Sequence, residues 1–597
     1  MQPTTEILER ISQNSLKNRN EVFTRIFRYM LRKDLYYVAY QNLYANNGAS
    51  TRGVDNDTAD GFSEEYVQNI IERLQNGTFQ PKPTRRVQIP KANGKMRPIS
   101  IPCFTDKMVQ EVMRIILEAI YEPIFSNFSH GFRPNRSCHT ALEQVKREFT
   151  GVKWFVEGDI KGCFDNIDHT TLISLINNKI KDARFIQLIW KFLKAGYLDN
   201  WQYHKTFSGT PQGGIISPLL ANIYLNELDN YVAKLKAEFD RPRQRVYDPL
   251  YSKTMHEIRA IKTKLDKCNS FEKQFLLNEL KVTRQKLHKV PCSSKTDKRL
   301  VYVRYADDFL VGVVGSREDS EQIKAKLTEF VKERLKMELS QEKTLITHSN
   351  NYARFLGYDV RVRRSNQLKR SKNGMVCRSL NNKVERNIPI TDKIEKFLFA
   401  KGIVYKKNGQ LVPCKRVRFL HLTDLEIVTA FNAEIRGICN YYNLASNFCD
   451  LHYFSYLMEY SCLKTLGAKH KCSIKKIIDK YRDGKGWAIS YQTQKGTHKI
   501  KIAKETDCKS KIDNPDPLPN TAMKYLHSTN SFEAKLNAKT CELCGTTESK
   551  FYEIHHVNKV KNLKGKIEWE RVMIARKRKT LVVCRECHKR IHGKKND

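Results

Sequence analysis

The chain has 597 residues, more than one hydrophobic core normally serves, so we expect about three to five domains. Its 106 Lys and Arg residues against 64 Asp and Glu give a formal net charge of +42, which calls for a polyanion or a membrane surface as partner. With 40% hydrophobic and 28% charged residues the composition excludes a disordered chain, and without an apolar run of about 18 residues no membrane span is expected, so nucleic acid is the better partner.

The first 80 residues are predicted to be helical, because apolar residues recur in them near helical spacing. The N-terminus lacks the apolar core of a signal peptide. Twelve of the 16 cysteines stand singly along the chain, as reduced thiols do. We therefore expect a cytoplasmic protein with no membrane partner.

Residues 85–102 (RRVQIPKANGKMRPISIP) predict two short strands around a glycine turn. Lys91 and Arg97 flank this turn and are candidates to clamp the triphosphate of a nucleotide. Arg97 would bind it bidentately and Lys91 would act as a point charge. The alternative for each residue, taken alone, is a solvated charge on the surface.

Two further segments place candidate nucleotide contacts beside turns. Residues 154–169 (WFVEGDIKGCFDNIDH) begin as an apolar strand that ends at Asp159. Phe164 follows that strand, where its ring can block a 2′-hydroxyl and so favour deoxynucleotides. Residues 208–229 (SGTPQGGIISPLLANIYLNELD) predict a glycine turn that leads into a helix, and the backbone of such a turn can approach a base or a template closely. Gln212 in that turn is a candidate to hydrogen-bond an incoming nucleotide.

Residues 241–300 have 16 Lys and Arg against 6 Asp and Glu, at helical spacing. They are predicted to form a basic helical insertion. We favour a surface that meets phosphates, and the alternative is a helical hairpin that is merely solvated.

Residues 301–313 (VYVRYADDFLVGV) predict a buried hairpin with two acids, Asp307 and Asp308, at its tip. Like charges side by side repel unless a cation lies between them. If the strand that ends at Asp159 lies beside this hairpin, three carboxylates converge and can bind two Mg²⁺ ions. Two such ions serve phosphoryl transfer, the chemistry of nucleotide polymerisation. The alternative is an ordinary polar hairpin tip.

Residues 60–365 resemble a reverse transcriptase, with its motifs in order: KMRPISIP, SHGFRPNRSCHTAL, GDIKGCFDNIDH, SGTPQGGIISPLLANIYL, YVRYADDFLV, LSQEKTLI and RFLGYDV. Over essentially the whole chain the closer resemblance is to the proteins encoded by group II introns. It implies fingers and palm over residues 1–365 and assigns the three aspartates as catalytic metal ligands. Lys343 lies in a motif of the family, where it either assists proton or pyrophosphate chemistry or is a plain surface lysine.

In that family residues 380–480 would form a helical thumb, the X or maturase domain. Thr423 and Glu426 have the spacing of a capping box. The resemblance implies binding of the folded intron RNA through rings and positive charges, with five candidate residues: Arg436, Tyr441, Tyr442, Lys464 and Lys469. The alternative for each tyrosine is a core position with a satisfied hydroxyl. Residues 485–537 are loose and basic, and we expect them to be a linker or small module that contacts DNA.

The C-terminal module from residue 538 has two CxxC pairs, formed by Cys541, Cys544, Cys584 and Cys587. This spacing predicts a structural tetrahedral Zn²⁺ site, because so small a module lacks a sufficient core of its own. The alternative is a pair of disulfides, which a reducing cytoplasm disfavours.

A second cation site is predicted beside the cysteines. His588 and His592 are four residues apart on one helical face, and with His555 they can hold a cation that keeps open positions for a phosphate. His556 would then be free to deprotonate a water molecule. This arrangement resembles the HNH (ββα-metal) nucleases, and Glu553 matches their acidic residue.

One residue departs from the HNH pattern, since Thr580 stands where that family usually has Asn. Asn558 and Asn562 lie nearby in the chain. Either of them replaces the missing side chain, or both are ordinary loop residues. A zinc-bound DNA clamp without cleavage is the alternative for the whole module.

The sequence thus predicts a multidomain α+β protein with reverse transcriptase fingers and palm, a helical thumb, a basic DNA-binding segment and a zinc-containing HNH module over residues 538–597. By resemblance it would bind intron RNA and promote splicing, cut one strand of a DNA target, and copy the RNA from dNTPs with Mg²⁺. Two alternatives are a splicing-only maturase and a bacterial reverse transcriptase outside introns. Whether two copies pair as a homodimer stays open.

Overall fold

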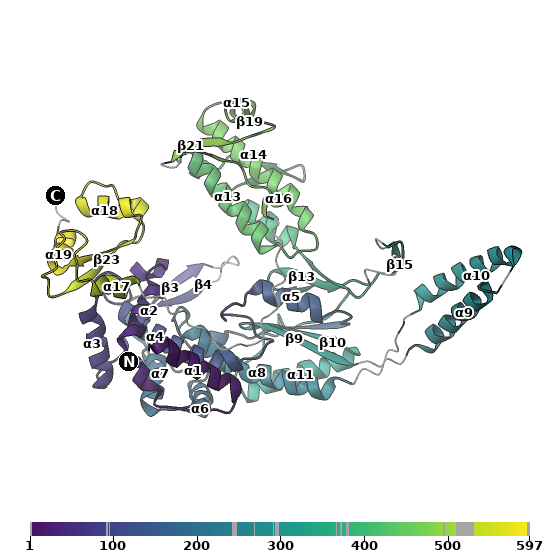
Figure 1. The fold of residues 1–597 in the computed structure, drawn as a ribbon, viewed down its shortest axis with the longest axis horizontal. Helices are drawn as coiled ribbons and strands as arrows, with labels where there is room; N and C mark the ends of the chain where they lie inside the picture. The colour runs from purple at the N-terminus through teal and green to yellow at the C-terminus, as the bar shows by residue number, and fades with distance from the viewer. Residues whose placement is uncertain are drawn as a thin grey trace.

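The structure is a computed structural model. It describes residues 3–90, 94, 96–241, 247–267, 269–290, 292, 298–365, 367–370, 373–377, 381–493, 496–508 and 531–593. Figure 1 shows a broad lower body, a helical part rising above it, a long helical hairpin at one side and the C-terminal module at the other. No helix among these residues combines the length and apolarity needed to cross a membrane.

The N-terminal region is helical, as its periodicity predicts. Its helices are α1 (Thr4–Lys17), α2 (Lys33–Leu43), α3 (Glu64–Gln75) and α4 (Phe104–Tyr121). Helix α4 is buried along nearly its whole length, and α1 and α2 pack against it. The central position of α4 makes this region a platform for the elements around it.

A four-stranded sheet in the order β4-β3-β7-β8 lies beside these helices. Its strands are β3 (Thr84–Pro90), β4 (Met96–Ile101), β7 (Tyr197–Asp199) and β8 (Gln202–His204). Strands β3 and β4 pair antiparallel with Ile89 opposite Arg97, which confirms the predicted hairpin. Lys91, in its turn, lies outside the described residues.

The central sheet has the order β11-β5-β10-β9, and all its pairs are antiparallel. Its strands are β5 (Trp154–Asp159), β9 (Arg299–Tyr305), β10 (Asp308–Val314) and β11 (Ile346–His348). Both faces are buried, which is why its sequences read as continuous apolar runs rather than as alternating ones.

Two hydrophobic clusters meet at the central sheet. Tyr302 and Val311 belong to the cluster that contains α8 (Ser217–Phe239) and α11 (Arg317–Glu333), whereas Val303 and Leu310 belong to the cluster that contains α5 (Cys138–Glu148). Side chains of a strand alternate between faces, so each strand contributes to both clusters. The hairpin of β9 and β10 is therefore clamped from two sides.

The remaining elements of the lower body connect these layers. They include β1 (Phe23–Thr24), β6 (Ile180–Lys181), α6 (His169–Lys179) and α7 (Ala183–Lys194). Strands β1 and β6 pair in parallel, and α6 packs against both α7 and α8.

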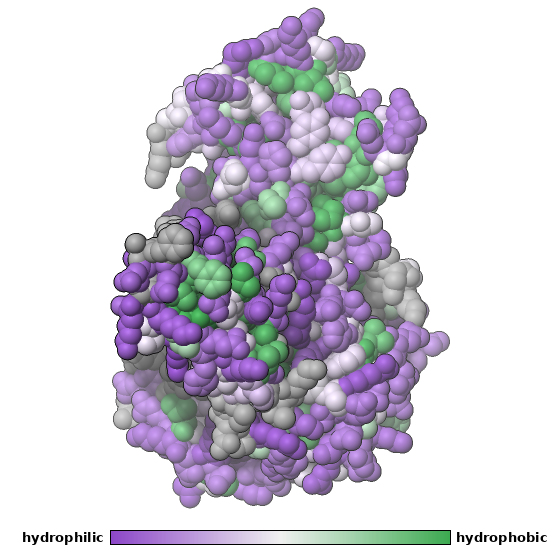
Figure 2. Space-filling model, turned by 90° about the vertical axis from the view of Figure 1, so that its right-hand side faces the viewer, coloured by the Kyte–Doolittle hydropathy of each residue, from purple (hydrophilic) through white to green (hydrophobic). Residues whose placement is uncertain are grey.

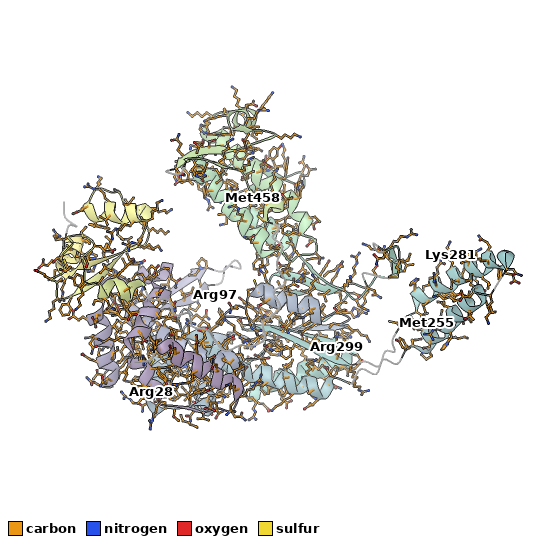
Figure 3. The ribbon with its side chains drawn as sticks, in the orientation of Figure 1. Arg28, Arg97, Met255, Lys281, Arg299 and Met458 are labelled. Carbon is orange, nitrogen blue, oxygen red and sulfur yellow. The ribbon has the colours of Figure 1, made fainter. Side chains whose placement is uncertain are left out.

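The basic insertion is a helical hairpin, as predicted, made of α9 (Pro249–Leu265) and α10 (Ser270–Lys289). It has a small core of its own, built on Ile258, Ile261 and Leu280. The hairpin projects from the lower body, with Met255 on one helix and Lys281 on the other (Figures 1 and 3). Figure 2 views the molecule from the side of this projection and shows a surface on which hydrophilic residues predominate.

The upper part begins with a sheet of β12 (Ala353–Phe355), β13 (Tyr358–Val362) and β16 (Val384–Asn387). Helices α13 (Asp424–Tyr441), α14 (Leu451–Lys469) and α15 (Ile474–Lys480) follow. The Thr423 hydroxyl accepts a hydrogen bond from the Glu426 backbone N–H, and the Glu426 carboxylate accepts one from the Thr423 backbone N–H, which confirms the predicted capping box.

Short elements complete the upper part. They are β14 (Lys369–Arg370), β15 (Val376–Cys377), α12 (Lys396–Ala400), β17 (Val404–Lys407), β18 (Gln410–Pro413), β19 (Arg482–Asp483), β20 (Gly486–Trp487), β21 (Ile489–Thr493), β22 (Gly496–Ile500) and α16 (Glu505–Cys508). Trp487, Ile489 and Ile502 are buried in the same cluster as α13 and α14. Described residues of 486–508 thus pack on the helical part, which differs from a linker and leaves the alternative of a small module.

The C-terminal module contains α17 (Ser531–Asn537), β23 (Tyr552–His556), α18 (Glu568–Arg576), β24 (Thr580–Cys584) and α19 (Arg585–Gly593). Strands β23 and β24 pair antiparallel and α19 follows directly, which is a ββα unit. A third strand in this sheet, β2 (Phe62–Ser63), comes from the N-terminal region. The sequence did not predict that pairing.

Candidate active sites

The three aspartates of the central sheet lie together at one end of it. We call Asp159, Asp307 and Asp308 the aspartate cluster. Asp308 is the register partner of Asp159 across β10 and β5, and Asp307 precedes it at the hairpin tip. All three side chains are half-buried. The strand pairing that a shared metal site requires is present.

Buried polar contacts hold the hairpin tip in place. The Arg304 guanidinium donates two hydrogen bonds to the Asp229 carboxylate on α8, at 2.8 and 2.6 Å, and both side chains are fully buried. The Tyr302 hydroxyl donates to the same carboxylate at 3.0 Å. Arg304 also donates to the backbone oxygen of Ala306 at 2.8 Å, directly before the two acids. A bidentate buried pair of this kind fixes orientation as well as position.

The motif SHGFRPN packs directly against this tip. The backbone N–H of His130 donates to the oxygen of Arg304 at 2.9 Å. A Cβ atom on Gly131 would lie 2.3 Å from the backbone nitrogen of Ala306, which no side chain can tolerate. Glycine is required there because two backbones approach closely.

The electrostatics of the aspartate cluster favour a bound cation. Burial, followed by repulsion from Asp307 and Asp159, raises the pKa of Asp308 to about 7. Burial also raises the pKa of Asp307 above its ordinary value. Lys343 Nζ lies 2.9 Å from Asp159 Oδ2 and is the near positive partner. Carboxylate oxygens are the ligands that Mg²⁺ prefers, so the donor set fits that ion.

The candidate nucleotide contacts surround the cluster unevenly. Arg97 lies on β4, near the outer end of the hairpin of β3 and β4 (Figure 3). Its positive charge lowers the pKa of Asp307, although burial raises that pKa by more. The ring of Phe164 is half-buried and meets that of Phe132 edge-on at 6.2 Å. The Gln212 side-chain amide donates to Asp165 at 3.0 Å, and both residues line one pocket.

The thumb candidates divide into exposed and engaged residues. Arg436 and Tyr441 are exposed, although the Tyr441 hydroxyl donates to the Leu356 oxygen at 2.7 Å. Tyr442 is buried at 4% exposure, so its ring is not available for stacking on a base.

The two lysines of this set are held by the protein itself. Lys464 donates to the oxygen of Pro413 at 2.7 Å. Lys469 is 2.6 Å from Asp424 Oδ1. Since Asp424 accepts from His470 and Tyr481 as well, Lys469 belongs to a network that joins α13 to α14 and α15.

The four cysteines of the C-terminal module form a compact group. Their sulfur atoms all lie within 4.8 Å of one another, and Cys544 and Cys584 are 3.8 Å apart. Sulfurs bound tetrahedrally to one zinc at about 2.3 Å are about 3.8 Å apart. Backbone N–H groups of Cys544 and Cys587 point at the sulfurs of Cys541 and Cys584. The group fits zinc, and its four members are free cysteines rather than disulfides.

The predicted histidines also converge. We call His555, His588 and His592 the histidine cluster, and their ligand atoms lie within 4.8 Å of one another and of Asp60. His588 Nδ1 donates to Glu553 Oε2 at 2.5 Å, which directs Nε2 into the cluster. In metal sites, a carboxylate such as that of Glu553 usually bonds the ring nitrogen of a histidine that does not face the metal, and so orients the ring. In the described part of the chain, the carboxylate oxygens of the aspartate cluster do not all lie within 4.8 Å of one another in this way.

His556 lies on the neighbouring position of β23 and outside the cluster. Its Nε2 is 3.0 Å from the backbone oxygen of Tyr44, on the N-terminal region. Burial lowers the pKa of His556, which keeps the imidazole neutral. Thr580, at the departure from the HNH pattern, is buried opposite His556 in the register of β23 and β24, whereas Asn558 and Asn562 are exposed.

Asp60 is the site residue that sequence reasoning missed. It precedes β2 in the N-terminal region, almost five hundred residues before the histidines. No spacing rule connects two segments so distant, so only the fold could bring Asp60 into the cluster.

Three stretches of the chain match known protein families. Residues 89–245 match reverse transcriptase (RNA-dependent DNA polymerase), residues 381–526 match type II intron maturase, and residues 541–588 match the AI2M/AI1M-like HNH endonuclease. Fold, sites and matches together define an enzyme that is both an RNA-directed DNA polymerase and a DNA endonuclease.

Whole-chain relatives narrow this class. The chain is 58% identical to the group II intron-encoded protein LtrA of Lactococcus lactis subsp. cremoris, over 99% of both chains. It is 34% identical to the putative COX1/OXI3 intron 2 protein of Saccharomyces cerevisiae, over 99% of this chain and 68% of that one. It is also 34% identical to protein YkfC of Escherichia coli, over 57% of this chain and 84% of that one.

The chain therefore belongs to the group II intron-encoded proteins, with reverse transcriptase, maturase and HNH endonuclease parts. This confirms the resemblance stated from the motifs. It also sets aside a bacterial reverse transcriptase outside introns, because the maturase and nuclease matches are both present.

Proposed function

We propose that the protein carries a group II intron into DNA by target-primed reverse transcription. It would bind the intron RNA and stabilise its active fold, since a partner that binds only the folded state favours that state. The RNA would enter one DNA strand, the nuclease would cut the other, and the new 3′-hydroxyl would prime cDNA synthesis. The observation that carries the polymerase step is the pairing of Asp159 with Asp308 at the clamped hairpin tip.

At the polymerase centre, Asp159, Asp307 and Asp308 would hold two Mg²⁺ ions. The ions would supply the Lewis acidity that phosphoryl transfer requires. Lys343, whose Nζ is 2.9 Å from Asp159 Oδ2, would lend a proton to the departing pyrophosphate. Arg97 and Lys91 would contact the triphosphate, Phe164 would exclude a 2′-hydroxyl and Gln212 would contact the incoming nucleotide.

At the nuclease centre, His555, His588 and His592 would hold a divalent cation, and Mg²⁺ is the candidate. His556 would take the proton from the attacking water after its Nε2 leaves the backbone oxygen of Tyr44. Both ring nitrogens of His555 are buried and make no hydrogen bond within the described structure, which supports a metal ligand at that position. The four cysteines would hold Zn²⁺ and keep the ββα unit folded.

The positive net charge of the chain, +42, supports contacts with RNA and DNA phosphates. Arg436 and Tyr441 are the thumb candidates that remain exposed, while Lys464 and Lys469 would act mainly by shaping the thumb. The hairpin of α9 and α10 would lie along RNA phosphates, and residues 485–537 would contact the DNA target.

The double substitution Asp307→Ala with Asp308→Ala tests the polymerase assignment. We expect cDNA synthesis to be abolished while intron RNA binding and splicing stay at the wild-type level, because those steps need affinity and not the aspartates. Primer extension and a splicing assay on the same preparation measure both. Loss of splicing as well would mean that the roles are misassigned.

The substitution His556→Ala tests the nuclease assignment. Removal of a general base typically lowers the rate by about 10²- to 10⁴-fold. We therefore expect cutting of the second strand to fall by this factor while insertion of the RNA into the first strand continues. End-labelled duplex DNA reports the two strands separately, and unchanged second-strand cutting would refute the role of His556.

A further inference from the structure

The carboxylate of Asp60 lies in the middle of the histidine cluster. Its Oδ1 is 3.1 Å from His555 Nδ1 and 3.3 Å from His588 Nε2, and its Oδ2 is 2.8 Å from His592 Nε2. The two nitrogens of His588 and His592 are 3.2 Å apart. Each histidine of the cluster therefore has one nitrogen within 3.3 Å of the same carboxylate.

These separations are those of atoms that share one cation. Ligand atoms at about 2.0–2.1 Å from a metal ion are about 2.8–3.4 Å from each other, from octahedral to tetrahedral angles. The Nε2 atoms of His588 and His592 face each other, and they can form a hydrogen bond only if one of them carries a proton. Hydrogen bonding therefore explains the contacts of these two histidines only in part. His555, at 3% exposure, makes no hydrogen bond through either nitrogen within the described structure. Its Nδ1 nevertheless lies 3.1 Å from Asp60 Oδ1.

Backbone contacts fix Asp60 in this position. The residue after it, Gly61, donates its N–H to the oxygen of Ile554 at 3.0 Å. Strand β2 then pairs with β23, with Phe62 opposite Ile554 and Ser63 opposite Glu553. The His556 backbone N–H donates to Asp60 Oδ1 at 2.7 Å. The pairing of β2 with β23 thus positions Asp60 at the histidine cluster.

Aromatic packing anchors the same junction. The ring of Phe62 stacks on that of Tyr40 at 4.1 Å, and Phe532 of α17 meets Tyr40 and Tyr44 edge-on at 5.2 and 4.8 Å. The C-terminal module and the N-terminal region consequently share one hydrophobic cluster. Packing of Phe62 therefore holds the segment that carries Asp60.

We propose that Asp60 is a fourth protein ligand of the nuclease cation, so that the N-terminal region completes a metal centre whose other ligands lie in the C-terminal module. This rests on the proposed binding of a cation by the three histidines. The carboxylate adds a hard ligand and a negative charge to three imidazoles, which shifts the preference of the site toward Mg²⁺ and Mn²⁺. His592 is 55% exposed, which leaves one side of the site open to a DNA phosphate.

Binding of Co²⁺ to the full-length protein, with zinc already in its cysteine site, tests the proposal through the visible absorption of the bound ion. We expect Asp60→Asn to weaken Co²⁺ binding by at least about 10- to 100-fold, because removal of a group that only orients a ligand already costs that much. Asp55→Asn is the matched control, since this carboxylate lies in the same loop but pairs with Lys82 at 2.7 Å. Equal Co²⁺ affinity in Asp60→Asn and the wild type would overturn the proposal.

A change of ligand separates direct binding from a structural role. Asp60→His should restore the affinity for Co²⁺ but not for Mn²⁺, because imidazole suits the first ion and carboxylate the second. Loss of both ions would mean that Asp60 only holds the module in place. Faster cutting of DNA by Asp60→Asn would also overturn the proposal, since the carboxylate would then be blocking the site.

The substitution His588→Ala distinguishes the two levels of the hypothesis. If it leaves Co²⁺ binding intact, the cation site of the proposed function fails. If it abolishes binding while Asp60→Asn does not weaken it, only the role of Asp60 fails.

Discussion

Arg304 shows how much a single residue contributes to placing the aspartate cluster. Its guanidinium is fully buried and is neutralised by Asp229 on α8. The same side chain bonds the backbone at Ala306, one residue before Asp307. A buried ion pair seldom adds net stability, but it does fix one geometry, and the loss of one partner leaves an uncompensated charge.

Asp229→Ala should therefore destabilise the protein by about 3–5 kcal/mol, because it strands the charge of Arg304 in the core. Chemical denaturation measures this loss. Arg317→Ala is the matched control, since its pair with Glu321 is exposed and such pairs are worth about 0–1 kcal/mol. If the two variants unfold at the same denaturant concentration, the buried pair does not hold the hairpin.

At the scale of elements, the hairpin of α9 and α10 is an attachment to the polymerase and not part of its core. It carries its own hydrophobic cluster. Its two ends are close together, since the N–H of Arg241 donates to the oxygen of Lys298 at 3.2 Å and that of Leu300 donates to Asp240 at 2.6 Å. A short connection can therefore replace it.

Replacement of residues 243–297 by a short glycine linker should leave a folded polymerase that extends a primer on a simple template. Intron RNA affinity should fall, and its dependence on salt should become shallower by about one unit of slope for each phosphate that the hairpin neutralises. Binding measured at several salt concentrations gives that slope. An unchanged slope would show that the hairpin is merely solvated.

For the molecule as a whole, the N-terminal region connects the two centres. It carries β3 and β4, with Arg97 near the aspartate cluster, and it also supplies β2 and brings Asp60 to the histidine cluster. Because residues from both ends of the chain share one hydrophobic cluster, docking of the C-terminal module is part of the fold.

Phe532→Ala should weaken that docking by about 3–5 kcal/mol, the usual cost when a buried aromatic ring is removed. Its ring is 4% exposed, so we expect faster hydrogen exchange in β2 and β23 with little change in the central sheet. Phe275→Ala is a control for the same substitution at 74% exposure on α10. Equal exchange rates in the two variants would show that the module docks without this ring.

Local patterns in the sequence determined much of this protein. The apolar runs, the paired acids, the CxxC spacing and the helical periodicity are local patterns, so the hairpin, the cysteine group and the inserted helices could be predicted. The ββα unit was predicted from the resemblance to HNH nucleases. Motif order along the chain was enough to indicate the family.

Tertiary structure decided what no local pattern encodes. Burial of Tyr442 and the pairing of Lys469 with Asp424 depend on how α13, α14 and α15 pack. The arrival of Asp60 among the histidines depends on the pairing of β2 with β23, two strands separated by most of the chain. These side chains come together because the fold places distant segments side by side. Their spacing along the chain does not predict that contact.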